Sequence, residues 1–168
     1  MESYPQPESM KLYLSELLVK DPYNKYCVDC TKNESTHANI SHGTFVCLNC
    51  ANILMNEFGM DKCYIKGIFN DLWDTYQLHA VTQGGNKKFW DFMKDYNLEA
   101  KEIVPKYLSS ESLYYKRRLA AIIQDRNFEE KAPAKNVDEL MDKGLDFSKK
   151  AVAKGGEVVN KISNWFNK

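Results

Sequence analysis

The sequence predicts a small domain of the α/β class, in its α+β form, followed by a separate C-terminal helix. Apolar residues recur at helical spacing in several segments, whereas only two short stretches have the pattern of strands. The helical signal then returns after a charged stretch that contains a proline. We therefore expect a mobile lead over residues 1–8, a folded domain over 9–128, a linker over 129–136 and a helix over 137–168.

The first half of the domain contains clear local stop signals. A helical stripe begins at Glu8 and ends at about Lys20, because the proline of Asp21-Pro22 disfavours helical backbone in the residue before it. The apolar run Thr44–Val46, entered through Gly43, indicates a short strand. The remaining elements predicted in this half are a short helix from Ala51 to Phe58 that Gly59 closes, and a strand within residues 63–68.

The second half is predicted to be helical. We expect Asn70-Asp71 to cap a helix that carries Leu72, Trp73, Tyr76, Leu78 and His79, and Gly84-Gly85 to end it. Asn86 then caps or opens another helix, and two more helical patterns occupy residues 99–128, the second of them over 110–124. Four aromatic residues of these segments are expected to lie in or near the core, namely Trp73, Phe89, Trp90 and Phe92.

Four cysteines form two Cys-x-x-Cys pairs, Cys27/Cys30 and Cys47/Cys50, separated by sixteen residues. Such pairs can surround one tetrahedral ion with four thiolates, and Zn²⁺ accepts this ligand set without redox chemistry. The alternative is a set of buried or disulfide-bonded cysteines, which the lack of a secretory signal disfavours. The sequence therefore predicts one structural zinc ion. His37, His42 and His79 are not needed as ligands, and Cys63 is expected to be a small half-buried residue.

The composition argues against some classes of function and some cellular locations. The net charge is zero and the pI is about 6.8, which argues against binding nucleic acid through a broad basic surface. No apolar run approaches the ~20 residues needed to span a bilayer. Cysteines committed to a metal fit a reducing compartment. We expect an intracellular protein, cytoplasmic or peripheral to a membrane, and an organellar location such as the mitochondrion stays open.

With these motifs in place, the chain resembles the zinc-finger domain of Arf GTPase-activating proteins (ArfGAP) over residues 9–128. The cysteine spacing matches that family, and Gly43 falls on the glycine of its spacer. Further matches follow in register: Asp71 and Trp73 on its Asp-x-Trp, residues 84–86 on its Gly-Gly-Asn, Phe89 and Phe92, Lys106-Tyr107, and Tyr115, Arg118 and Ala120 on its closing helix. The resemblance implies a zinc finger beside a short antiparallel sheet surrounded by helices, and an Arf-type GTPase as partner.

The resemblance fails where the family carries its catalytic arginine, five residues beyond the fourth cysteine. Met55 occupies that position here, and the first arginine in the chain is Arg117. A guanidinium at this point stabilises charge on the transferring phosphoryl group and is worth about 10³–10⁵ in rate, and lysine lacks the planar fork that makes this possible. Other positions near the family's catalytic edge also differ: His37 replaces a tryptophan, Asp61 a histidine and Lys66 an arginine.

The sequence is compatible with three functions. The first is a catalytically silent ArfGAP-like module used for binding or for building a larger complex. The second is an active GTPase activator that uses an unusual residue. The third, a zinc-dependent DNA reader, is opposed by the neutral charge and by the lack of an arginine-bearing helix after the finger.

The C-terminal segment 137–168 adds an apolar stripe, Met141, Leu145, Val152, Val159, Ile162 and Phe166, interrupted by Gly155-Gly156. From Met141 onward it has six lysines and three acidic residues. This basic amphipathic pattern is compatible with an anionic membrane surface, with a protein partner such as a subunit of a larger complex, or with packing on the chain's own domain.

Overall fold

The computed structural model describes residues 7–152, with side chains described up to residue 144. The chain divides into two compact units, Met1–Lys131 and Ala132–Lys168. The predicted mobile lead lies outside the described residues except for Pro7 and Glu8, and Glu8 is the first residue of a helix. The Gly155-Gly156 interruption and the apolar residues beyond it also lie outside the described residues.

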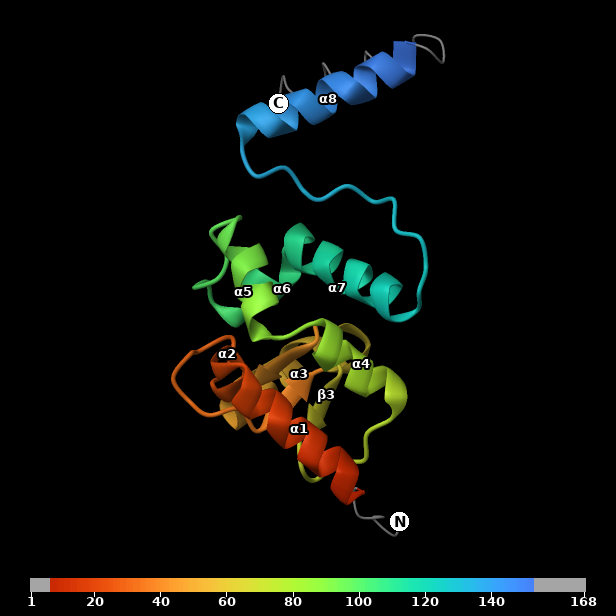
Figure 1. Cartoon of the computed structure of the whole chain (residues 1–168). Coiled ribbons are helices and arrows are strands. Elements are labelled where there is room, and N and C mark those ends of the chain that lie inside the picture. Colours follow the sequence, from red (N-terminus) through yellow and green to blue (C-terminus); the bar gives the residue numbers. More distant parts are fainter. Residues whose placement is uncertain (1–6, 153–168) are drawn as a thin grey trace. The chain divides into compact units, whose positions relative to one another are not determined.

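The first unit is of the α+β class, as predicted (Figure 1). Its elements in chain order are α1 (Glu8–Lys20), α2 (Pro22–Lys25), β1 (His37–Asn39), β2 (Thr44–Val46), α3 (Leu48–Lys62), β3 (Ile65–Gly67), α4 (Thr75–Gln83), α5 (Asn86–Lys94), α6 (Ile103–Leu108) and α7 (Ser110–Ile123). The three strands pair antiparallel in the order β2-β1-β3, with Ala38 opposite both Phe45 and Lys66.

The sheet contributes to two hydrophobic cores, because successive side chains of a strand point to opposite faces. Phe45 packs in a core with residues of α1 and α4, which include Leu14 and Ala80. The next residue, Val46, packs in a second core with the four cysteines and residues of α3, α5, α6 and α7. This second core includes Leu54 and Phe89. The predicted zinc site is therefore part of a core rather than an outlying loop.

Several predicted boundaries agree with the structure. Helix α1 ends at Lys20, and the Asp21 side chain accepts a hydrogen bond from the Tyr23 amide (2.9 Å), so the same Asp-Pro that ends α1 also begins the short helix α2. Strand β2 and the end of α4 at Gly84 also lie where expected. Helix α3 is longer than predicted: Gly59 (φ 69°) breaks the regular helix, as expected, but helical turns resume and continue to Lys62.

The helix predicted to begin at Asn70-Asp71 is wrong in its start. Helix α4 begins at Thr75, where Asp74 and Gln77 form a reciprocal capping box. Asp71 instead accepts a hydrogen bond from the Gly67 amide (2.6 Å), and the Trp73 indole donates to the Gly67 carbonyl (2.9 Å). These two residues therefore fasten the loop to the end of β3. The sequence pattern could not distinguish this use of Asp71, in a turn with a residue four positions earlier, from a helix cap.

The second unit contains α8 (Val137–Val152). Asn136 caps it by accepting a hydrogen bond from the Glu139 amide (2.8 Å). The first turn is acidic, with Asp138 and Glu139. Over its whole length α8 has four acidic residues and three lysines, so the basic character predicted for segment 137–168 does not extend to this helix. None of the helices in the described part of the chain is long and apolar enough to cross a membrane.

Candidate metal centre

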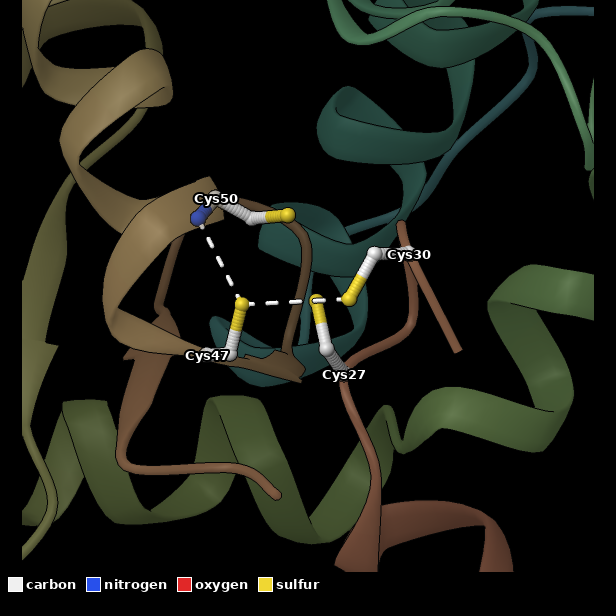
Figure 2. Close-up of side chains that lie close together, drawn as sticks. All are labelled: Cys27, Cys30, Cys47 and Cys50. Atoms are coloured by element: carbon white, nitrogen blue, oxygen red, sulfur yellow. Dashed lines mark hydrogen bonds between the residues drawn. The ribbon is translucent and has the colours of Figure 1, made fainter. Parts of the chain in front are cut away.

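The fold brings together the four cysteines of the predicted zinc site (Figure 2). Cys27 and Cys30 lie on the turn that follows α2, Cys47 is the N-cap residue of α3, and Cys50 lies in the first turn of that helix. Their sulfur atoms all lie within 4.8 Å of one another, and the sulfurs of Cys30 and Cys47 are 3.8 Å apart.

This geometry fits zinc. A tetrahedral ion with Zn–S distances of about 2.3 Å places its sulfur ligands about 3.8 Å apart. The four cysteines can therefore coordinate one zinc ion, as predicted. No histidine, aspartate or glutamate joins the cluster within residues 7–144, so the ligand set is purely thiolate. An all-sulfur tetrahedral set leaves no open coordination position, which is the pattern of a structural site.

Hydrogen bonds and burial act in opposite directions on the pKa values of the cysteines at this site. The Cys50 amide (3.5 Å) and the Asn33 side-chain amide (3.7 Å) both donate hydrogen bonds to the Cys47 sulfur. A hydrogen bond from Cys50 lowers the pKa of Cys27 to about 5, whereas the same bond raises the pKa of Cys50. Cys27 therefore holds its proton less tightly than Cys50, whereas burial raises the pKa of Cys47 and keeps that thiol protonated. A zinc ion must displace the protons of Cys47 and Cys50, so zinc affinity decreases as the pH falls.

A buried ion pair holds the turn Cys27–Cys30, which we call the first zinc knuckle. Asp29 lies between Cys27 and Cys30, and its carboxylate binds the Lys106 ammonium at 3.1 Å, with both side chains only 1% exposed. The Tyr107 hydroxyl donates to both oxygens of the same carboxylate (2.9 and 3.0 Å). Burial raises the pKa of Asp29, and Lys106 acts in the opposite direction. This pair connects the metal knuckle to α6.

Asn86 forms a second long-range connection to the knuckle. Its side-chain oxygen accepts from the Phe45 amide (2.7 Å), and its side-chain nitrogen donates to the carbonyls of Tyr23 (2.9 Å) and Tyr26 (2.8 Å). Its own amide donates to the Asn24 side chain (2.9 Å). The prediction that Asn86 opens a helix is confirmed, since α5 begins at Asn86, but its N-cap residue is Gly85 and not Asn86. Asn86 instead joins β2 to the chain that leads into Cys27.

His42 and Cys63 are buried and have structural positions. His42 is buried edge-on against the Phe89 and Tyr107 rings and is hydrogen-bonded to the Ser112 hydroxyl (3.0 Å). Burial lowers the pKa of His42 to about 3, so it is neutral at physiological pH. Cys63 is 1% exposed, more buried than predicted, and burial raises the pKa of its thiol to about 11.

Helix α3, which begins at the metal centre, contains no arginine. Met55 lies on α3 with 39% of its surface exposed, near the exposed Leu48 and Ile53 of the same helix. Arg117 lies on α7 and binds the Glu130 carboxylate through two nitrogens, 2.9 and 2.5 Å from its oxygens. Arg126 follows α7 and is bound to the Gln124 side chain.

Comparisons with known proteins agree with this geometry. Residues 13–132 match the model of the ArfGap family, described as "Putative GTPase activating protein for Arf". The yeast (Saccharomyces cerevisiae) ADP-ribosylation factor GTPase-activating protein GCS1 is 30% identical over 111 residues, which are 64% of this chain and 31% of that protein. Human stromal membrane-associated protein 1 is 35% identical over 81 residues, 48% of this chain and 17% of the relative.

A solved structure shows the same fold. The Cryptosporidium parvum protein described as a putative GTPase activating protein for ADP ribosylation factor superposes with a TM-score of 0.60 at 22% identity, covering 73% of this chain and 98% of that one. The chain spans between about a fifth and a third of the length of the first curated relatives that it matches. The family match, the fold and the four-cysteine centre agree, and the chain belongs to the ArfGap family.

Proposed function

We propose that the chain is a catalytically silent ArfGAP-like module, which binds a protein partner or takes a place in a larger assembly without stimulating GTP hydrolysis. The observation that carries this proposal is the composition of α3. The position five residues after Cys50, where the resemblance places the catalytic arginine, holds Met55, and no arginine precedes Arg117.

The physical argument concerns charge in the transition state. Phosphoryl transfer spreads negative charge over the transferring group, and an arginine supplied in trans is worth about 10³–10⁵ in rate. The Met55 thioether has no positive charge and no hydrogen-bond donor. The exposed residues of α3 near it include Asn52 and Asn56, which are uncharged, and Glu57, whose charge is negative. Such a face suits protein contact better than phosphoryl transfer.

Single-turnover GTP hydrolysis on a panel of Arf-type GTPases tests the proposal. The zinc-loaded chain is expected to accelerate hydrolysis by less than about tenfold on every GTPase, since it lacks the catalytic arginine that contributes a factor of about 10³ or more to the rate. An acceleration above about 10³-fold on any of them would show an active GTPase activator that uses a non-standard residue, which is the alternative function.

A pair of variants tests whether Met55 marks the place of the missing group. Met55→Arg restores a guanidinium to the exposed side of α3, and Ile53→Arg is the matched control because Ile53 is equally exposed (42%) on the same helix but two residues away, on another side. We expect Met55→Arg alone to gain hydrolysis on a GTPase that the chain binds. Equal gain from both variants would contradict the assignment of Met55.

The C-terminal unit is proposed to contact protein rather than an anionic membrane. The support is the charge of α8, whose four acidic residues outnumber its three lysines. Full-length chain should therefore stay in the supernatant when sedimented with vesicles of anionic lipid, and co-sedimentation that depends on the anionic lipid would favour the membrane. We also infer an intracellular location, which is supported by cysteines that are free and arranged for metal rather than paired in disulfides.

A further inference from the structure

A hollow of about 390 Å³ lies between α5 and α7, with the last residue of α4 at its border. Three apolar side chains line it, Phe92 from α5 and Leu119 and Ile122 from α7. Leu119 is almost fully buried, whereas Ile122 is 48% exposed. The volume falls within the range of pockets that accept small ligands or single peptide side chains.

Two cations line the same hollow, Arg118 from α7 and Lys88 from α5. Arg118 is exposed, and it forms no hydrogen bond or ion pair with the part of the chain that the structure describes, in contrast to its paired neighbour Arg117. The Lys88 ammonium donates to the Gln83 carbonyl (2.9 Å), which leaves its charge without an acidic partner.

One carboxylate, that of Asp91, also lines the hollow, but its charge is already balanced. The Lys87 ammonium lies 2.6 Å from an Asp91 oxygen. The hollow therefore presents two uncompensated positive charges beside an apolar wall. Unpaired guanidinium groups bind planar carboxylates through two parallel hydrogen bonds.

We propose that this hollow binds an acidic peptide segment of a partner protein, with an Asp or Glu carboxylate on Arg118 and Lys88 and an adjacent apolar side chain on Leu119 and Ile122. A free inorganic anion would satisfy the cations but leave the apolar wall in water. A nucleic acid would require clustered positive charge over a wider surface, and this chain is neutral overall. The surface is separate from α3, so this binding is independent of whether the chain stimulates GTP hydrolysis.

Peptide display followed by affinity measurement tests this surface. Short random peptides displayed on phage are selected on the zinc-loaded full chain, and selected peptides are measured by fluorescence polarisation. We expect enrichment of peptides with Asp or Glu beside Leu, Ile or Met. Enrichment of peptides without acidic residues, or of none above background, would overturn the proposal.

The chain offers a matched control at an adjacent position. Arg118→Ala and Lys88→Ala each remove a cation of the hollow, and charge-assisted hydrogen bonds of this kind predict a loss of about tenfold or more in affinity. Arg117→Ala removes the same charge one residue away, from a pair that is already formed and lies outside the hollow, and should change affinity by no more than about twofold.

Two outcomes would contradict the assignment. Equal losses from Arg117→Ala and Arg118→Ala would mean that only general charge attracts the peptide. Complete displacement of the peptide by inorganic phosphate, beyond the effect of a sodium chloride control at equal ionic strength, would mean that the hollow is an anion site in which the apolar wall has no part.

Discussion

Lys106→Met should destabilise the protein strongly, because it leaves the Asp29 carboxylate buried without its cation. Both side chains are 1% exposed, and the two charged atoms are 3.1 Å apart. Removal of one partner of a buried pair costs about 3–5 kcal/mol, since the remaining charge keeps its desolvation penalty. For a domain of this size, that corresponds to a decrease in Tm on the order of 10 °C.

The double variant Asp29→Asn/Lys106→Met separates charge from packing. It removes both charges and keeps an oxygen that can accept from the Tyr107 hydroxyl, so most of the lost stability should return. Lys87→Met, which breaks the exposed pair with Asp91, is the control and should leave the Tm unchanged. Urea unfolding of the zinc-loaded variants, followed by tryptophan fluorescence, gives the free energies.

The pH dependence gives an independent check on the same pair. Burial raises the pKa of Asp29 above its unfolded value, so the folded state holds the proton more tightly. The stability contributed by this group is therefore fully present below the unfolded pKa and is lost as the pH rises through the folded pKa. Lys106→Met should consequently be less destabilising at pH 6 than at pH 8. A single variant within ~1 kcal/mol of wild type, or a double variant no better than the single, would refute the reasoning.

Three further predictions follow from other contacts. Asn86→Ala leaves the Phe45 amide and two carbonyls without partners and should cost about 2–4 kcal/mol in urea unfolding; a cost below ~1 kcal/mol would show that water replaces the side chain. Gly43→Ala should destabilise more than Gly59→Ala, although both have positive φ, because its Cβ would meet the Ala80 carbonyl oxygen whereas that of Gly59 enters open space; equal decreases in Tm would contradict this. Cys63, buried and with its pKa raised to about 11, should not react with a thiol reagent between pH 7 and 9 until a chelator removes the zinc and the domain unfolds; rapid reaction of one thiol in the zinc-loaded protein would show that Cys63 is accessible.

The parts of the fold that are predictable from sequence are those with local causes. The end of α1 follows from Asp21-Pro22, the end of α4 from Gly84, and the four-cysteine centre from spacing alone. Zinc ligands of this kind are recognisable because the coordination geometry restricts both the residue type and the interval between the residues.

The rest depends on partners that are distant in sequence. Asp71 is an exception, because its carboxylate accepts from the Gly67 amide only four residues earlier, and the local pattern of this turn is the same as that of a cap. The role of Asn86 requires carbonyls about sixty residues earlier, and the role of Asp29 requires Lys106, 77 residues later. No periodicity or propensity in a single sequence encodes such pairs, since a window of one element contains only one of the two partners.

The long-range connections of the first knuckle have a consequence for how this zinc finger can be isolated. A peptide cut around Cys27 and Cys50 would contain every metal ligand, but it would lack Asn86, Lys106 and Tyr107, which hold the knuckle from other helices. In such a fragment, the free energy of metal binding alone would have to stabilise the folded backbone. We therefore expect that the finger of this protein does not fold on its own, and that the smallest piece with native metal affinity extends at least through α6.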